Sequence, residues 1–400
     1  MYCSEEDIIR IRENINIKDY ILRKIKLTKN GDLYIGKCPF HKSGISSFIV
    51  DEKKQTYGCF ECGHAGDIFD FIMEYYKKSF SDAVCMAAMM TGIEIKKDVL
   101  DKQYYRQQKE IIDINRFAKE LYQKSLYAND SALEYVKNRN LEIHTLEKYG
   151  IGYADPTMHI YDELIKQGFK EEDIMISGLV AEKDRYGNVL KEKERYDKFY
   201  NRIIFPIMNE NNVVIGFGGR IIGDKKPKYI NSQETIIYNK SSCLFGLNIA
   251  RSSPYDYFLL CEGFMDVISM HQAGFDNAIA SLGTSLTMNQ ILKLSRFKKK
   301  IIITYDSDEP GLKAAKRAIT MLDSCKMDVK VLDLKPYKDP DEFIGILGTA
   351  ELKKRISNAE NAYPWCIKNV IKSEDLPYEK KIDDIADIFE KQYQMKEVCK

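Results

Sequence analysis

The apolar positions between residues 255 and 335 fall into four short runs: "YFLLC", "NAIASL", "KIIITY" and "VKVLDL". Each run is rich in aliphatic or β-branched residues and is too short for an ordinary helix. Helical stretches separate the runs. This alternation is typical of βαβ units, so we predict a parallel sheet with helices around it.

The preceding part of the chain has a different pattern. Residues 1–100 open with isoleucines at helical spacing, continue with short strand-like pieces, and reach the helical segment "GHAGDIFDFIMEYY", for which Asp67 is the predicted N-cap. Residues 101–112 are polar and contain neither Gly nor Pro, which favours a helical linker over a loose coil. Residues 113–250 combine helical stretches with strands and Gly-rich turns, a pattern that predicts an α+β region.

A chain of 400 residues is too long for one ordinary hydrophobic core. We therefore predict an α+β multidomain protein with parts at 1–100, a linker at 101–112, and further parts at 113–250, 251–345 and 346–400. The last part is predicted to be helical, and its amphipathic face is marked by Ile382, Ile385, Ile388 and Phe389.

Composition narrows the class of protein further. Hydrophobic residues make up 44% and the net charge is +1, values that fit a globular chain and neither require nor exclude a nucleic-acid partner. The basic patches "DKKPK" and "RFKKK" are either solvated loops or parts of a local basic ridge. We see no signal peptide and no apolar run of about 18 residues, and most of the cysteines are scattered singly along the chain. We therefore expect a cytoplasmic protein without a membrane span.

Three of the ten cysteines belong to a cluster with a histidine. The spacing is Cys38-x2-His41-x17-Cys59-x2-Cys62, in which two chelating pairs flank a segment of hairpin size. This arrangement predicts one tetrahedral Zn²⁺ site, and because all four positions are filled by protein ligands the site should be structural. His64 is an alternative to His41 as the fourth ligand.

Aromatic residues accompany this cluster on the predicted strands "SSFIVD" and "QTYGCF". Phe48, Tyr57 and Phe60 could form a small core behind the metal, or they could be an exposed platform on which single-stranded bases stack. The sequence leaves both interpretations open.

Acidic residues follow three of the predicted strands. Glu262 follows the strand 257–261, Asp306 and Asp308 follow 301–305, and Asp339 and Asp341 come after 331–334. Ligands of open α/β sheets bind at the carboxyl ends of the strands, where such acids would repel one another without cations between them. The pattern therefore predicts a site for Mg²⁺ or Mn²⁺.

An EF-hand is a weaker interpretation of "YDSDEPG". That calcium loop needs a preceding helix, an oxygen ligand at its fifth position and a final Glu, whereas here a strand precedes and the fifth position is Pro310. Asp308 is also a candidate N-cap for the helix that follows, and this role is compatible with metal binding.

These motifs together resemble bacterial DNA primase of the DnaG type. "CPFH…CFECG" resembles its CHC2 zinc ribbon, while "EGFMDV", "SLGTS", "YDSDEPG" and "KDPDEF" resemble, in order, its Toprim (topoisomerase–primase) module. Between them, "NRIIFPI", "VIGFGGR", "PKYINSQET" and "LFGL" are similar to the basic N-terminal part of its polymerase core. The resemblance covers nearly the whole chain to about residue 350.

The resemblance implies roles for individual residues. Glu262, Asp306 and Asp308 would be catalytic and, with Asp266, Asp339 and Asp341, would hold two or more Mg²⁺ or Mn²⁺ ions. One structural Zn²⁺ would be bound by the cysteines and His41. Nucleotide, template or primer would be bound by a further set: Arg139, Arg202, Arg220, Lys228, Tyr229, Asn231 and Lys240.

The implied function is synthesis of short RNA primers from NTPs on a single-stranded DNA template. The rival hypotheses are a Toprim topoisomerase or nuclease, and a zinc-dependent DNA-binding module without catalysis. We expect a monomer whose partners are template, NTPs and RNA primer. The family's C-terminal helicase-docking domain is expected to be missing, which leaves a replicative helicase as an open candidate partner.

Overall fold

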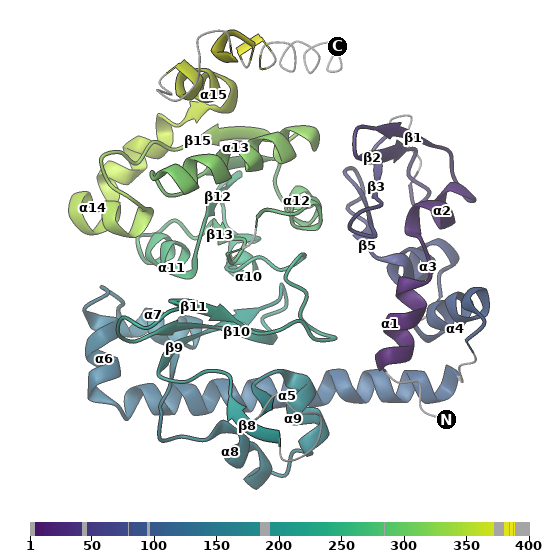
Figure 1. The fold of residues 1–400 in the computed structure, drawn as a ribbon. Coiled ribbons are helices and arrows are strands. Elements are labelled where there is room, and N and C mark those ends of the chain that lie inside the picture. The colour runs from purple at the N-terminus through teal and green to yellow at the C-terminus, as the bar shows by residue number, and fades with distance from the viewer. Residues whose placement is uncertain are drawn as a thin grey trace. The chain divides into compact units, whose positions relative to one another are not determined.

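The computed structural model describes residues 5–41, 46–78, 80–93, 97–184, 193–283, 285–371, 380–383, 385–386 and 388 (Figure 1). The chain divides into two compact units. The first comprises Met1–Cys243 with Met288–Arg296, and the second comprises Leu244–Thr287 with Phe297–Lys400.

The first unit begins with a five-stranded antiparallel sheet whose strands are in sequence order. The strands are β1 (Leu27–Asn30), β2 (Leu33–Gly36), β3 (Phe48–Asp51), β4 (Thr56–Cys59) and β5 (Ala65–Gly66). The flanking helices are α1 (Glu5–Glu13), α2 (Ile17–Leu22), α3 (Ile68–Tyr76) and α4 (Phe80–Thr91). The predicted N-cap of α3 is confirmed, because the Asp67 side chain accepts hydrogen bonds from the N–H groups of Phe69 and Asp70.

A single long helix, α5 (Lys97–Tyr127), follows and contains the whole of the predicted linker 101–112. A continuous helix is what a polar segment without Gly or Pro favours. The next helices are α6 (Asp130–Lys137), α7 (Ile143–Tyr149), α8 (Ile160–Lys166) and α9 (Glu171–Ser177).

The first unit also holds a four-stranded antiparallel sheet in the order β11-β10-β9-β6. Its strands are β6 (Gly152–Ala154), β9 (Arg202–Met208), β10 (Val214–Ile221) and β11 (Tyr229–Asn231). The central pair β9 and β10 is almost fully buried, and side chains of α5, α8 and α9 complete its core. A separate hairpin, β7 (Val180–Asp184) with β8 (Lys193–Asp197), and the helix α12 (Met288–Ser295) complete the unit.

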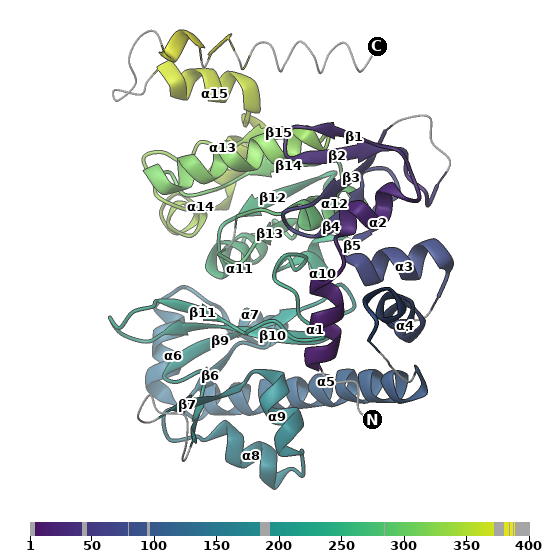
Figure 2. The ribbon, with the colours of Figure 1, turned by 45° about the vertical axis from the view of Figure 1, so that its right-hand side comes forward.

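The second unit is the predicted α/β region, with the sheet order β13-β12-β14-β15-β16. The first four strands are parallel: β12 (Tyr257–Cys261), β13 (Ala278–Ala280), β14 (Lys300–Ile303) and β15 (Asp328–Val331), while β16 (Glu360–Asn361) is antiparallel to β15. Its helices are α10 (Leu247–Ala250), α11 (Phe264–Gln272), α13 (Glu309–Ser324), α14 (Pro340–Ser357) and α15 (Ala362–Ile371). Both ribbon views show α13 beside β15 and α11 beside α14 (Figure 1, Figure 2).

The strand order of this sheet reverses its direction between β12 and β14. From β12 the chain passes through α11 to β13 on one side, whereas from β14 it passes through α13 to β15 on the other side. The reversal makes the carboxyl ends of β12 and β14 a topological switch point, which is where open α/β sheets bind ligands. No sequence pattern revealed this order.

Two predicted strand limits need correction. The strand predicted at 331–334 lies at Asp328–Val331, and the one predicted at 301–305 ends at Ile303. The later residues are apolar because they are buried in the core rather than because they are in a strand: Leu332 and Leu334 are both almost fully buried. Part of the pairing persists beyond the strand ends, since the Leu332 N–H donates to the Ile303 carbonyl.

The predicted helical C-terminal part contains α14 and α15. Gly348, with φ of 77°, interrupts the regular dihedral angles of α14. Of the predicted amphipathic face, Phe389 lies outside the described residues. Within the described residues, no helix is both long enough and apolar enough to cross a membrane.

Candidate metal centres and nucleotide-binding residues

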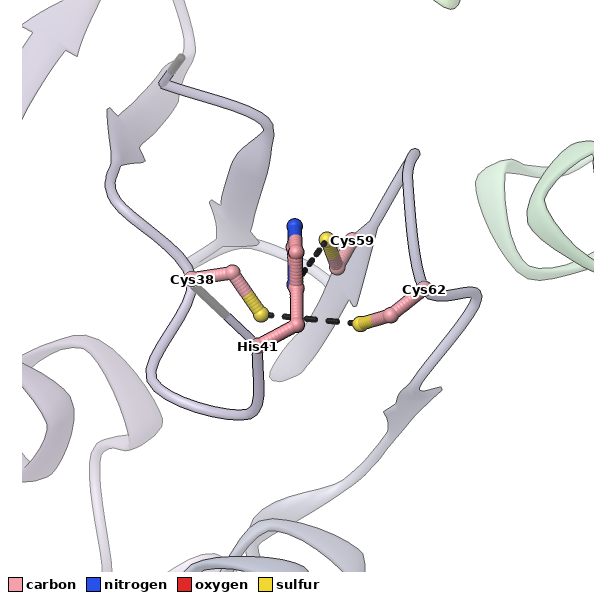
Figure 3. A group of neighbouring side chains, drawn as sticks. All are labelled: Cys38, His41, Cys59 and Cys62. Carbon is pink, nitrogen blue, oxygen red and sulfur yellow. Dashed lines mark hydrogen bonds between the residues drawn. The ribbon is translucent and has the colours of Figure 1, made fainter. Parts of the chain in front are cut away.

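The four predicted zinc ligands come together at one end of the five-stranded sheet (Figure 3). Cys38 and His41 follow β2, Cys59 is the last residue of β4, and Cys62 lies in the turn before β5. One ligand atom from each residue lies within 4.8 Å of all the others.

The distances between these ligands fit a tetrahedral zinc site. The Sγ atoms of Cys38 and Cys62 are 3.6 Å apart, and the Nδ1 of His41 is 3.8 Å from the Sγ of Cys59. A zinc–sulfur bond of about 2.3 Å requires ligand atoms about 3.8 Å apart in a tetrahedron. A hydrogen bond from Cys38 lowers the pKa of the Cys59 thiol, and the thiolate is the form of cysteine that binds metal.

Glu61 is an additional residue of this site that sequence reasoning missed. Its Oε2 lies 2.6 Å from the His41 Nε2 and accepts a hydrogen bond of 2.9 Å from the Ser47 hydroxyl. This contact turns the Nδ1 of His41 toward the cysteines, as the partners of metal-binding histidines commonly do. The signal was available in the sequence, since Glu61 stands between two ligands in "CFEC".

His64, the alternative ligand, is not part of the cluster. Its Nδ1 is 3.2 Å from the Sγ of Cys62, and its Nε2 is 3.2 Å from a carboxylate oxygen of Glu74. The residues that meet the distance criterion are Cys38, His41, Cys59 and Cys62. His41 is therefore the histidine that fits the zinc.

The aromatic residues beside the zinc cluster form a core. Phe48 and Tyr57 are 0% and 2% exposed, and their rings are stacked with centroids 5.4 Å apart. Phe71 of α3 packs edge-on against both. For Phe48 and Tyr57 the stacking-platform interpretation is wrong, because their faces are covered by other side chains.

The acidic residues of the second unit gather at the switch point of its parallel sheet. Glu262 directly follows β12, and Asp306 is the third residue after the end of β14. The Asp306 N–H donates a hydrogen bond of 3.1 Å to the Glu262 Oε1, so the two strand ends are directly joined. Asp308 caps α13 as predicted, accepting a bond of 3.0 Å from the Gly311 N–H.

The other acids come from α11 and the start of α14. The Asp266 carboxylate accepts a bond of 3.0 Å from the Gly263 N–H, and Asp339 is the N-cap of α14. Asp341 receives a short hydrogen bond of 2.5 Å from the Ser269 hydroxyl on α11. Helix caps and a hydroxyl thus fix three carboxylates whose positions no strand determines.

The electrostatics of these acids show that they form one group. The pKa of Asp266 is raised by burial and then by Asp339 and Asp306. The pKa of Glu262 is raised by burial and by Asp306. Burial also raises the pKa of Asp306, although the neighbouring Lys338 opposes the shift. Carboxylates that raise one another's pKa in this way favour a bound cation.

Lys338 places a positively charged ammonium group among these carboxylates. Its Nζ lies 3.4 Å from the Asp306 carboxylate and 3.6 Å from that of Asp308. Sequence reasoning missed this residue, although it directly precedes "DPD".

The carboxylates are spread over a wider patch than the zinc ligands. Among the described residues, only the zinc group has three or more ligand atoms within 4.8 Å of one another. Mg²⁺ usually keeps several waters and binds through one or two carboxylates, so the all-oxygen donor set fits such ions.

The predicted nucleotide-binding residues lie in the first unit, where two of them are buried. Arg202, 8% exposed, donates to the backbone carbonyls of Gly219, Pro227 and Lys228. Arg220, 4% exposed, donates to the hydroxyls of Tyr135 and Tyr229 at 2.9 and 2.7 Å.

The remaining members are more accessible. Lys228 is exposed and directly precedes β11, the strand that carries Asn231. The Arg139 guanidinium lies 5.8 Å from the centre of the Tyr135 ring. Lys240 is close enough to lower the pKa of Lys198, after the larger effect of burial. Sequence reasoning had not selected Lys198.

A closed Cys3His site and an acidic switch point in a parallel sheet define a zinc-ribbon protein with a Toprim-type module. Family comparisons agree with this class: residues 3–103 match the CHC2 zinc finger, residues 121–251 the N-terminal domain of the DNA primase catalytic core, and residues 259–344 a Toprim-like domain. The chain is 35% identical to the DNA primase of Aquifex aeolicus over 367 residues, which cover 90% of this chain and 71% of that protein. The chain belongs to the DnaG-type DNA primase family.

Solved structures are similar as well. The zinc-binding and RNA polymerase domains of the Aquifex aeolicus primase match with a TM-score of 0.62 and 32% identity, covering 96% of this chain and 92% of that one. A DnaG primase catalytic domain bound to single-stranded DNA matches with a TM-score of 0.59 and 30% identity, covering 66% and 84%.

The chain spans only part of some of its relatives. It is 36% identical to the DNA primase of Clostridium acetobutylicum over 396 residues, and this match covers 96% of the chain but 65% of the Clostridium protein.

Proposed function

We propose that this chain is a DNA primase that synthesises short RNA primers from NTPs on single-stranded DNA. The observation that carries the proposal is the meeting of Glu262 and Asp306 at the switch point, within a group of carboxylates that raise one another's pKa. Membership of the primase family adds support.

In this proposal Glu262, Asp306 and Asp308 hold the divalent cations, and Asp266, Asp339 and Asp341 complete the acidic patch. Divalent cations at these carboxylates would neutralise the triphosphate, so that a 3′-hydroxyl could lose its proton and attack the α-phosphate while the bond to the β-phosphate breaks and pyrophosphate leaves. The protein contributes positioning: the Asp306–Glu262 hydrogen bond fixes two strand ends, and the N-cap fixes Asp308 at the start of α13.

The first unit would bind the nucleic acid. Lys228, Lys240 and Arg139 carry charges suited to phosphates, and the zinc ribbon would contact the template. Single-stranded DNA is the ligand of a related DnaG catalytic domain, and we extend that class of ligand to this chain. We also propose that the protein works in the cytoplasm.

The test is a primer-synthesis assay with the whole chain, labelled NTPs and a single-stranded template. We expect short RNA products that require both template and Mg²⁺ or Mn²⁺. Absence of product with either ion would overturn the proposal. Nicking or relaxation of supercoiled DNA without NTPs would instead support the topoisomerase or nuclease hypothesis.

A further inference from the structure

The buried guanidinium group of Arg202 is surrounded by main-chain carbonyls. One terminal nitrogen donates to the carbonyls of Gly219 and Lys228, both at 3.2 Å, and the other donates to the Pro227 carbonyl at 3.0 Å. In the described part of the chain, no carboxylate forms an ion pair with this arginine. Its charge is therefore balanced by carbonyl dipoles of β10 and of the loop that follows this strand.

That loop connects β10 to β11 and carries Lys228. The Lys228 carbonyl receives a second hydrogen bond, of 3.0 Å, from the Ile221 N–H. The neighbouring Asn201 also contributes, since its side-chain amide donates to the Ile222 carbonyl at 3.2 Å. The main chain of Lys228 is thus fixed from two sides, while its side chain is exposed.

The sheet makes room for this arrangement. A Cβ atom at position 219 would lie only 3.1 Å from the Cδ of Arg202 and 2.6 Å from a ring carbon of Phe199. Gly219, the last glycine of "GFGGR", therefore lets the aliphatic part of the Arg202 side chain cross β10 toward the loop.

Arg220 follows the same principle on the same hairpin. It is paired with Tyr229 in the β10–β11 register, donates to the Tyr229 hydroxyl, and lies 5.3 Å from the centre of that ring. Both buried arginines thus direct at least one donor at the segment 227–229.

We propose that Arg202 is a positioning residue that fixes the loop so that Lys228 meets a phosphate of the single-stranded DNA, and that Arg202 itself does not contact that phosphate. The inference deepens the proposed function and rests on it.

The test is a double-mutant cycle between Arg202→Lys and Lys228→Gln. The measured quantity is the affinity of the whole chain for a fluorescent single-stranded oligonucleotide over a range of salt concentrations. Arg202→Lys keeps the positive charge, but a single ammonium group cannot reproduce a planar fork that reaches three carbonyls. Melting curves establish that each variant is folded.

Loss of one phosphate contact to a single strand lowers the salt slope by about 0.7. We expect Lys228→Gln to lower it by about this amount and Arg202→Lys to do the same despite its retained charge. In the Lys228→Gln background, Arg202→Lys should change the affinity less than about 2-fold.

A matched control uses Lys225, an exposed lysine of the same loop whose carbonyl Arg202 does not contact. In a Lys225→Gln background, Arg202→Lys should keep its full effect. If Arg202→Lys does not fold, Asn201→Gly is the second variant, because it removes the hydrogen bond to Ile222, together with the one from the Tyr153 hydroxyl, without changing any charge. It should also lower the salt slope.

Additive effects of Arg202→Lys and Lys228→Gln, or an unchanged salt slope in folded Arg202→Lys, would overturn the inference. Wild-type affinity in Lys228→Gln would overturn it too, while leaving the proposed function in place. Failure of the wild-type chain to bind the oligonucleotide or to make primers would contradict the proposed function itself.

Discussion

Three cationic side chains of this protein have different roles because their donors reach different partners. The Lys338 ammonium lies between the carboxylates of Asp306 and Asp308, whereas the guanidinium groups of Arg202 and Arg220 end on carbonyls and phenols. The net charge of +1 for the whole chain does not reveal these different partners. The role of each charged side chain depends on whether it is buried and on which group it neutralises.

Lys338→Met should strengthen the binding of Mn²⁺ to the acidic patch by about 3- to 10-fold, because it removes a positive charge that competes for the same carboxylates. The effect is moderate since the ammonium group is more than half exposed. Titration calorimetry, or the paramagnetic resonance signal of free Mn²⁺, measures the dissociation constant. Lys353→Met, on an exposed position of α14, is the control. Equal affinities of wild type and Lys338→Met would show that Lys338 is not a competitor.

Glu61→Ala should weaken zinc binding by about 10- to 100-fold, because His41 loses the hydrogen-bond partner that orients its ring. Competition with a chromogenic chelator gives the zinc affinity of each variant. Glu74→Ala is a matched control, since Glu74 pairs with His64, which is not one of the four ligands. Greater zinc loss in Glu74→Ala than in Glu61→Ala would mean that the ligand set includes His64.

At the scale of secondary-structure elements, the start of α13 is fixed against the strand end that precedes it. Asp308 caps the helix by accepting from the Gly311 N–H, and a Cβ atom at position 311 would overlap the backbone carbonyl of Asp306. The helix can lie this close only because residue 311 is glycine. The position of α13 therefore determines the position of Asp306.

Gly311→Ala should reduce metal-dependent primer synthesis by about 10- to 100-fold, because the added methyl group must displace either α13 or Asp306. Thr320→Ala, on the exposed side of the same helix, should leave synthesis unchanged. Product per unit time on a labelled template measures both variants. Wild-type activity in folded Gly311→Ala would contradict the close contact between the helix and the acid.

The same scale shows what the sequence could predict. The apolar runs predicted β12 and β14, and the acids could be identified because they directly follow these runs. The "DIFDF" pattern predicted the capped helix α3. Apolar character alone misplaced β15, since Leu332 and Leu334 are buried without being in the strand. The reversal of strand order between β12 and β14 depends on long-range pairing, which local periodicity does not record.

For the whole molecule, the zinc cluster and the acidic patch differed in how completely they could be predicted. Zinc ligands are close in sequence and their residue types are distinctive, so the three cysteines and His41 could be predicted from spacing, and the fold then decided between His41 and His64. The acidic patch assembles from strand ends, helix caps and α11, and the contact of Lys338 with two of its carboxylates is known only from the fold. The hydrogen-bond acceptors of Arg202 could not be predicted either, because they are backbone carbonyls, which no residue type in the sequence indicates.

The central claim is that the acids at the switch point form the catalytic metal centre of a primase. The most direct measurement compares primer synthesis by wild type, Asp306→Ala and Asp256→Asn in the same Mg²⁺- or Mn²⁺-dependent assay. Asp256 directly precedes β12, at the opposite end of that strand from Glu262, and pairs with the exposed Lys300, so its loss should have little effect on synthesis. We predict that Asp306→Ala loses primer synthesis while remaining folded and that Asp256→Asn retains it. Full product from Asp306→Ala would contradict the claim.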